Sequence, residues 1–231
     1  MHKPYKLLVL SHSLLFLGLG LWFSPLQISL HKLETQIFFF FNQTLTIPYW
    51  QEFWGLLNHR SEGSINLILA ACLNIMIIMK TPRPLQRKLI GQTLYFWLLF
   101  QLGFMLQRDL SDAFINTPRF SPTLVCSPVL RLSTLLDNVR IKDASHNSFP
   151  GGHAFAMMYW GIFTYYIAPK RWGVLALFLG SFLCLPRLMS GAHWVSDVVF
   201  SILLAFVWFA WSLVIWYTSL FAAWHTKRQK L

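Results

Sequence analysis

The sequence predicts an all-α integral membrane protein with six transmembrane helices, built as a single domain over residues 1–231. Hydrophobic residues make up 55% of the chain and charged residues only 12%, about half the charged share of an average soluble domain. The remaining charges leave six apolar runs that approach or exceed the length of a membrane span. Three scattered cysteines, at positions 72, 126 and 184, exclude a disulfide framework and a cysteine-based metal site.

The apolar runs give the expected helices in chain order. The first lies between Lys6 and Pro25 and lacks a small-residue cleavage site, so we expect an uncleaved span rather than a signal peptide. The second and third end at Lys80 and Arg108, and a Pro-Lys-Arg turn separates the fourth from the fifth. The predicted spans are about 7–23, 64–79, 89–106, 154–168, 172–185 and 198–224.

Two long connections join these spans. Residues 24–63 contain an aromatic stretch over 37–42 and further aromatics from Tyr49 to Trp54. Amphipathic aromatic segments settle at the membrane interface, so we expect interfacial helices in this first outer loop. Residues 107–152 are polar and rich in proline, and a loop of this length is usually functional.

The basic residues predict the orientation of the spans. One set of span ends carries 11 Lys and Arg and no acidic residue, whereas the opposite set carries 8 basic residues and all 8 acidic ones. Because Lys and Arg accumulate in cytoplasmic loops, we expect both termini in the cytoplasm and both long connections on the periplasmic side. The net charge of +11 therefore indicates orientation and contact with anionic lipid, not nucleic acid.

Three polar segments are expected to meet on the outer side: 119–123, 149–153 and 187–197. Within the third, His193 and Asp197 are four residues apart. On a helix this spacing puts both side chains on one face, where the carboxylate can orient the imidazole. An imidazole oriented in this way is a better nucleophile or a better base.

The other residues of these segments suit a phosphoryl group. Arg119 and Arg187 offer bidentate donors for phosphoryl oxygens. The Gly152 backbone, at the start of the fourth span, lets N–H groups approach an anion closely, and His153 can protonate a leaving oxygen. The combination indicates phosphoryl transfer through a phosphohistidine. Since no acidic cluster accompanies these segments, we expect no metal and no cofactor.

These segments resemble the type 2 phosphatidic acid phosphatase superfamily, whose signatures are K-x6-R-P, P-S-G-H and S-R-x5-H-x3-D. The third signature is matched in spacing by Arg187, His193 and Asp197, with Pro186 in place of the leading serine. Residues 150–153 match the second signature, with glycine in place of serine. The resemblance extends over about residues 64–224 and implies the six-helix layout.

The first signature survives only as Arg119, because Asp112 and Phe120 replace its lysine and proline. The departures are shared with one branch of the superfamily, the lipid A 1-diphosphate synthases of bacterial inner membranes. That branch has R-x-S-P-T-L, K-D-A-S-x-x-S-F-P-G-x-H and P-R-x-M-x-G-A-H-W, which correspond to 119–124, 142–153 and 186–194. Its members transfer a phosphate from undecaprenyl pyrophosphate to the 1-phosphate of lipid A on the periplasmic face.

The resemblance implies a role for each site residue and two lipid partners, a polyprenyl pyrophosphate donor and a lipid A acceptor. His193 is the expected nucleophile, Asp197 orients it, and His153 protonates the leaving lipid phosphate before deprotonating the acceptor. The groups expected to bind phosphate are Arg119, Arg187, the Gly152 backbone and Lys142, the last in place of the missing lysine of the first signature.

Two alternatives remain open. One is a lipid phosphatase that uses water as acceptor and hydrolyses undecaprenyl pyrophosphate, phosphatidylglycerol phosphate or phosphatidate. The other is a catalytically silent membrane protein on the same scaffold. Arg60 either contacts the acceptor lipid or forms a surface pair with Glu62, and His59 and His146 have no assigned role.

Overall fold

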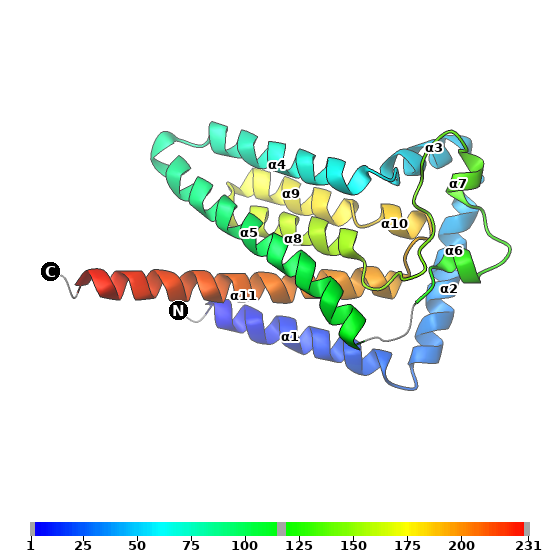
Figure 1. The fold of residues 1–231 in the computed structure, drawn as a ribbon, viewed down its shortest axis with the longest axis horizontal. Helices are drawn as coiled ribbons and strands as arrows, with labels where there is room; N and C mark the ends of the chain where they lie inside the picture. The colour runs from blue at the N-terminus through cyan, green and yellow to red at the C-terminus, as the bar shows by residue number, and fades with distance from the viewer. Residues whose placement is uncertain (1–2, 115–118, 229–231) are drawn as a thin grey trace.

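The structure, a computed structural model, describes residues 3–114 and 119–228 and is built from helices (Figure 1). Six long helices run along the same axis as a bundle, and α1 begins at the end of the bundle where α11 terminates (Figure 1). This arrangement confirms the expected all-α class. The six helices are α1 (Lys3–Trp22), α4 (Glu62–Lys80), α5 (Arg83–Phe114), α8 (Gly152–Ile167), α9 (Lys170–Phe182) and α11 (Val195–Arg228).

Among the described residues, five segments are long and apolar enough to cross a membrane, and they correspond to the first, second, third, fifth and sixth predicted spans. The fourth, α8, has only 16 residues. Its side chains are buried continuously from Ala154 to Thr164, in the middle of the bundle. An apolar run of this kind is typical of a helix surrounded by other helices.

Helix α5 corrects the predicted start of the second long loop at residue 107. The helix continues through Gln107 to Phe114, beyond the predicted end of the span at residue 106. A charge-free run marks only the membrane-embedded part of a helix, because charged side chains such as Asp109 can project outward from a helix that extends further.

Close contact between α8 and α9 depends on glycine. A Cβ at Gly180 of α9 would lie 2.6 Å from the carbonyl oxygen of Met157 in α8, and one at Gly161 of α8 would lie 3.1 Å from that of Ala176. Small residues at a helix crossing let two backbones touch, which is the usual way for membrane helices to gain packing energy. The chain segment that precedes α8 and the one that follows α9 are therefore held at a fixed distance from each other.

Helix α2 (Gln27–Thr44) crosses the end of the bundle at a steep angle, and α3 (Pro48–Leu57) follows it (Figure 1). Glu34, Phe38 and Asn42 form the buried stripe of α2. Asn42 anchors the helix, since its amide donates to the Leu130 carbonyl at 2.7 Å and its side-chain oxygen accepts from the Leu130 N–H at 2.9 Å. Large apolar residues of both helices remain exposed, as expected of interfacial helices.

Three short helices complete the polar end of the molecule: α6 (Pro122–Val125), α7 (Leu132–Leu135) and α10 (Pro186–Met189). A single antiparallel bridge between His59 and Ile141 joins the turn after α3 to the loop after α7. These connections fold the two long outer segments over the ends of α5 and α8 (Figure 1).

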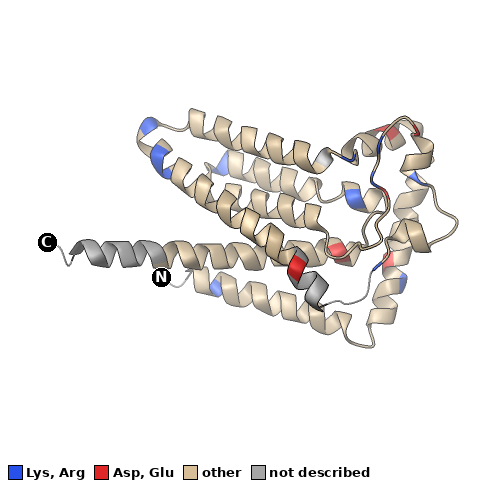
Figure 2. Ribbon diagram, viewed as in Figure 1, with Lys and Arg blue, Asp and Glu red and all other residues tan. Residues whose placement is uncertain are grey.

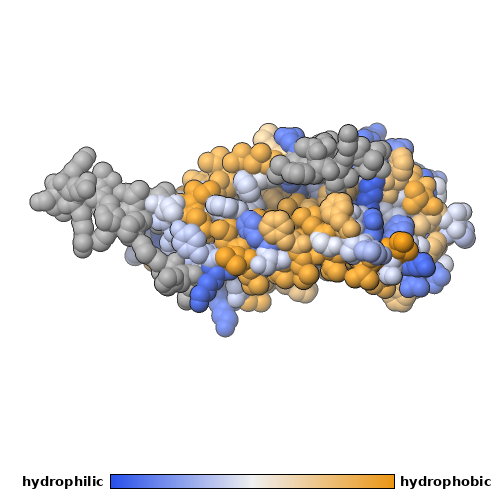
Figure 3. Space-filling view, turned by 90° about the horizontal axis from the view of Figure 1, so that it is seen from below, coloured by the Kyte–Doolittle hydropathy of each residue, from blue (hydrophilic) through white to orange (hydrophobic). Residues whose placement is uncertain are grey.

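Charge is distributed unevenly along the bundle axis. In the part of the chain that is described, acidic residues lie toward the α2 end of the molecule, whereas the turn from α4 to α5 carries only basic ones (Figure 2). The face turned toward the viewer in Figure 3 is hydrophobic over much of its middle, with hydrophilic residues gathered toward its ends. This pattern fits a protein whose helices cross a membrane.

Candidate active site

A cavity of about 720 Å³ opens among the outer ends of the bundle and the loops folded over them. It brings together five of the seven predicted site residues: Lys142, Gly152, His153, Arg187 and His193. Arg60 and Gln107 also line it. Arg119 and Asp197 are not among the residues that line the cavity. Asp197 lies beside the His193 ring, and Arg119 pairs with Asp197.

His193 is held in one orientation by a backbone carbonyl. Its Nδ1 donates a hydrogen bond to the Ser148 carbonyl oxygen at 2.6 Å, and the Asp197 carboxylate lies 3.7 Å from the same nitrogen. Since a carbonyl only accepts, the hydrogen of the neutral ring is on Nδ1 and the lone pair is on Nε2. Nε2 is therefore the ring nitrogen that can act as a base or a nucleophile.

The spacing of His193 and Asp197 does bring the two side chains together, but not on a shared helix face. His193 precedes α11, and Asp197 lies in its first turn. The turn that carries His193 is closed by Arg187, whose carbonyl accepts from the N–H groups of Ala192 and His193 at 3.1 and 3.2 Å. Gly191 has φ +71° in this turn, a conformation that favours glycine.

Asp197 is completely buried and joins three groups. One carboxylate oxygen accepts from the Trp194 N–H at 2.8 Å, the bond that a carboxylate in the first turn makes to the residue before the helix. The other oxygen accepts a hydrogen bond from Arg119. The carboxylate therefore fixes the start of α11 and lies beside the His193 ring.

Arg119 is engaged by acidic and aromatic side chains rather than by the cavity. Besides Asp197, its guanidinium donates to Ser196 Oγ at 2.8 Å and to Glu34 at 3.0 Å. The guanidinium also lies 4.6 Å from the Trp22 ring, a cation–π distance. These contacts use both terminal nitrogens of the Arg119 guanidinium as donors to groups outside the cavity lining.

Glu34 supplies the second acidic group, from α2. One of its oxygens accepts from Arg119 and the other from the Ser196 N–H at 2.7 Å. The N–H groups in the first turn of a helix have no partner within the helix, so Glu34 satisfies one of those of α11. Glu34 is 6% exposed, and its burial depends on these partners.

Arg187 and Lys142 meet at the cavity wall. An Arg187 N–H donates to the Lys142 main-chain carbonyl at 3.1 Å, which aligns the guanidinium, and both side chains line the cavity. Arg187 is 6% exposed whereas Lys142 is exposed. The structure thus provides one buried cation next to the His193 turn and one exposed cation at the same cavity wall.

His153 is tied to the end of α9 by its ring. Its Nε2 lies 3.0 Å from the Leu183 carbonyl, which fixes the hydrogen of the neutral ring on that nitrogen and makes Nδ1 the basic atom. The neighbouring Gly152 N–H is donated to the Pro150 carbonyl at 2.9 Å. Gly152 therefore contributes close approach of its backbone, and a Cβ there would lie 3.1 Å from the Gln107 side-chain nitrogen.

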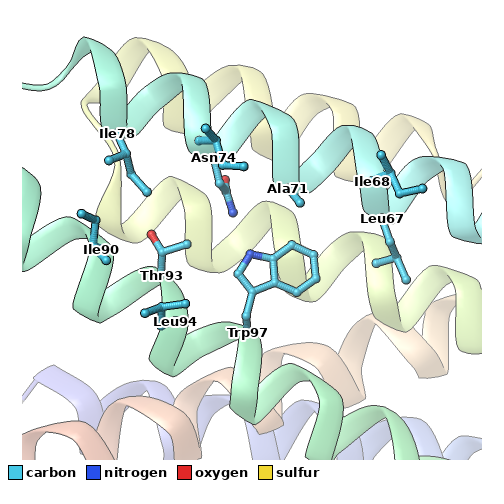
Figure 4. A pocket seen from close by; sticks show the side chains of 10 residues that line it. Leu67, Ile68, Ala71, Asn74, Ile78, Ile90, Thr93, Leu94 and Trp97 are labelled. Atoms are coloured by element: carbon cyan, nitrogen blue, oxygen red, sulfur yellow. The ribbon is translucent and has the colours of Figure 1, made fainter.

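An apolar groove of about 390 Å³ lies between α4 and α5. Leu67 lines both the groove and the cavity, so the two spaces adjoin at this residue. Figure 4 shows aliphatic side chains of α4 facing Ile90, Leu94 and Trp97 of α5 across the groove. A polar cavity continued by an apolar groove suits a ligand with an anionic head and a hydrocarbon chain.

The family of the chain follows from comparison with known proteins. The model of the PAP2 superfamily matches residues 64–221. The chain belongs to the PAP2 superfamily. The matched residues include His153, Arg187, His193 and Asp197. They do not include α2, which carries Glu34. PAP2 proteins are phosphatases or phosphotransferases, which confirms the predicted class of enzyme.

Two similar proteins agree with this assignment. The chain is 30% identical over 181 residues to Lipid A 1-diphosphate synthase of Escherichia coli (strain K12), with 77% of this chain and 74% of that protein covered. The crystal structure of a transmembrane PAP2-type phosphatidylglycerolphosphate phosphatase from Bacillus subtilis superposes with a TM-score of 0.58. At 16% identity, with 93% of this chain and 96% of that chain covered, the second similarity shows the PAP2 fold.

Sequence reasoning missed three groups at the site: Glu34, Gln107 and the Ser148 carbonyl. Glu34 had a detectable signal, because it is the only acidic residue in the α2 sequence and shares a helical stripe with Phe38 and Asn42. Gln107 was assigned to a loop although the helix continues through it. A backbone carbonyl such as that of Ser148 leaves no mark in the sequence.

Proposed function

We propose that the protein transfers a phosphate from a polyprenyl pyrophosphate, such as undecaprenyl pyrophosphate, to the 1-phosphate of lipid A. The observation that carries this proposal is the His193 ring, held by the Ser148 carbonyl at the wall of a cavity that also contains Arg187 and Lys142. The similarity to a lipid A 1-diphosphate synthase favours these substrates, and the groove between α4 and α5 offers space for a hydrocarbon chain.

In the first half-reaction, Nε2 of His193 attacks the terminal phosphorus of the donor. A phosphorus–nitrogen bond forms while the bond to the bridging oxygen breaks, and the polyprenyl phosphate leaves with a proton from His153. The ring gains positive charge during attack, and the Asp197 carboxylate at 3.7 Å stabilises that charge. Arg187 binds the transferring phosphoryl oxygens, and Lys142 adds a second cation for substrate phosphate at the cavity wall.

In the second half-reaction, an oxygen of the acceptor phosphate attacks the phosphohistidine. His153 takes a proton from the acceptor phosphate, which replaces the one that left with the polyprenyl phosphate, and the phosphorus–nitrogen bond breaks to restore His193. Arg119 contributes from behind the site by holding Asp197 in place. No step uses a metal ion or a cofactor.

The proposed location is a bacterial inner membrane, with both termini in the cytoplasm and the cavity on the periplasmic side. The basic turn between α4 and α5 and the acidic residues toward the α2 end support this orientation (Figure 2). Both substrates are membrane lipids, so the donor and acceptor can reach the cavity from the bilayer.

The purified protein, given undecaprenyl pyrophosphate labelled in its terminal phosphate, tests the proposal. With lipid A present, we expect the label in lipid A 1-diphosphate, and an acid-labile labelled enzyme when the reaction is quenched early. Label released only as free phosphate in the presence of lipid A would identify a lipid phosphatase instead. Substitution His193→Ala should abolish turnover; unchanged turnover, or none in the parent protein, rejects the proposed histidine chemistry.

A further inference from the structure

The β-bridge beside the cavity aligns two basic side chains. The Arg60 N–H donates to the Arg140 carbonyl at 2.7 Å, and the Lys142 N–H donates to the Asn58 carbonyl at 3.0 Å, on either side of the His59–Ile141 pair. Side chains alternate between the two faces of extended strands. Arg60 and Lys142 therefore share one face of this short ribbon, with His59 and Ile141 on the other.

The cavity lining shows which face is which. Arg60 and Lys142 both line the cavity, whereas Ile141 packs against the apolar cluster that contains Trp54 and Leu132. Arg60 is exposed, so its guanidinium is accessible from the cavity mouth. Arg140 lies opposite Arg60 on the same face of the ribbon and is also exposed, but it is not among the cavity-lining residues.

These cations exceed what one transferring phosphoryl group requires. Arg187 is buried, and its backbone closes the His193 turn, which places it with the reacting phosphorus. Arg60 and Lys142 lie on a separate element, and the cavity volume of about 720 Å³ is in the range that holds a drug-sized ligand. The space and the charge are therefore suited to a second phosphate group.

We propose that Arg60 and Lys142 form a second phosphate subsite, which binds the phosphate of the acceptor lipid. The inference rests on the proposed phosphotransferase function. A phosphate monoester carries a charge of about −1.5 to −2 at neutral pH, so it is repelled by the phosphoryl group on His193 unless cations lie next to both. Water, the acceptor of a phosphatase, has no such charge to neutralise.

The test compares Michaelis constants for the two lipids in matched variants. We expect Arg60→Gln to raise the KM for lipid A about tenfold, the loss of one charge-assisted hydrogen bond, and to raise it more than the KM for undecaprenyl pyrophosphate. The double variant with Lys142→Gln should give about a hundredfold rise. Arg140→Gln removes the same charge from the same ribbon outside the cavity and serves as the control.

Three outcomes of this test would overturn the proposed phosphate subsite. An equal or larger rise in the donor KM would assign the two cations to the donor's own pyrophosphate. An equal effect of Arg140→Gln would show a general charge effect of the ribbon, and unchanged constants in Arg60→Gln would show that Arg60 binds neither lipid.

A failure of the proposed function gives a different result. If the parent protein only hydrolyses its donor, inhibition of hydrolysis by N-acetylglucosamine 1-phosphate still reports on the subsite. Weaker inhibition in Arg60→Gln but not in Arg140→Gln would retain the subsite and reject the transferase. If N-acetylglucosamine 1-phosphate inhibited the Arg60→Gln and Arg140→Gln variants equally, the subsite would be rejected.

Different contacts carry a second inference, which concerns Glu34. Its carboxylate joins α2 to the start of α11 and to Arg119, and through Arg119 to Asp197 beside His193. We infer that Glu34 is a positioning residue for His193, supplied by a helix outside the residues that match the family model. Its loss would leave the Ser196 N–H without its partner and let Arg119 move away from Asp197.

The variant Glu34→Gln keeps the size of the side chain and removes its charge. We expect kcat to fall about tenfold with the donor KM changed less than about twofold, since the broken ion pair holds the nucleophile rather than the substrate. Glu34→Asp should restore part of the rate. Glu52→Gln, a carboxylate that is exposed on α3, is the matched control and should behave as the parent.

Two results would overturn the role of Glu34. One is an unchanged kcat in Glu34→Gln. The other is a fall in activity that only follows the loss of folded protein, measured by thermal unfolding of the same samples, because a merely structural residue changes the amount of active enzyme and not its kcat per folded molecule.

Discussion

The carboxylate of Asp197 offers the most direct test of the His193 geometry. Substitution Asp197→Asn keeps the side-chain size, and the amide oxygen can still accept from the Trp194 N–H, a bond of 2.8 Å in the parent. It removes the negative charge that lies 3.7 Å from Nδ1 of His193. The substitution therefore isolates the electrostatic contribution of the carboxylate from its role at the start of α11.

The distance gives the expected size of the effect. Attack by Nε2 leaves the imidazole with up to one positive charge, and at 3.7 Å with an effective dielectric constant of about 20 the attraction to the carboxylate is about 4 kcal/mol. That energy corresponds to about a thousandfold in rate. Arg119 cancels part of the carboxylate's field, so we expect kcat to fall by about 10²–10³.

Pre-steady-state formation of labelled phosphohistidine is the appropriate assay, because it reports the attack step alone. Asp143→Asn is the matched control: Asp143 is 3% exposed, pairs with Arg131 at 3.1 Å and accepts from the Ser133 N–H, yet it does not line the cavity. Both variants should lose comparable stability, but only Asp197→Asn should lose the rate. A rate within fivefold of the parent would refute the proposed electrostatic role.

Three further predictions concern packing, the groove and the outer loop. Gly180→Leu puts a side chain where even a Cβ would lie 2.6 Å from the Met157 carbonyl, so it should destabilise the bundle by at least about 2 kcal/mol; an unchanged thermal midpoint in detergent argues against the close α8–α9 contact. Ala71→Phe narrows the α4–α5 groove and should raise the KM of a long-chain donor more than that of a short-chain one, whereas equal changes would place the chain elsewhere. Burial raises the pKa of the Cys126 thiol, which lowers its thiolate fraction at neutral pH, so maleimide labelling should be slow at pH 7 and accelerate steadily as the pH rises; a rate that levels off by pH 8 contradicts the raised pKa.

The sequence was a good guide to the parts of the site that are close together along the chain. The spacing of Arg187, His193 and Asp197 identified the group that forms the cavity wall and its support. The prediction of a shared helix face was wrong because residues 190–194 form a turn between α10 and α11, and His193 lies in that turn. Local spacing shows that two side chains can meet, but several backbone conformations satisfy it.

Arg119 shows what the sequence left undetermined. An arginine in an outer loop near two other basic motifs suits a phosphate, and nothing local contradicts this role. Its actual partners, Glu34 and Asp197, are 85 and 78 residues away along the chain. Opposite charges far apart in the sequence pair only when the fold brings them together, so the helix that supplies Glu34 decides what Arg119 does.

The shortness of α8 has a consequence for the depth of the reaction. Sixteen residues extend over about 24 Å at 1.5 Å per residue, less than the roughly 30 Å of a bilayer's hydrocarbon core. A helix of this length cannot reach both membrane surfaces, and His153 in its first turn lines the cavity among the ends of the helices and the loops. In the proposed reaction, the phosphates of both lipids would then have to leave the headgroup layer and enter this cavity, while a bulky sugar attached to one of them would stay at the mouth.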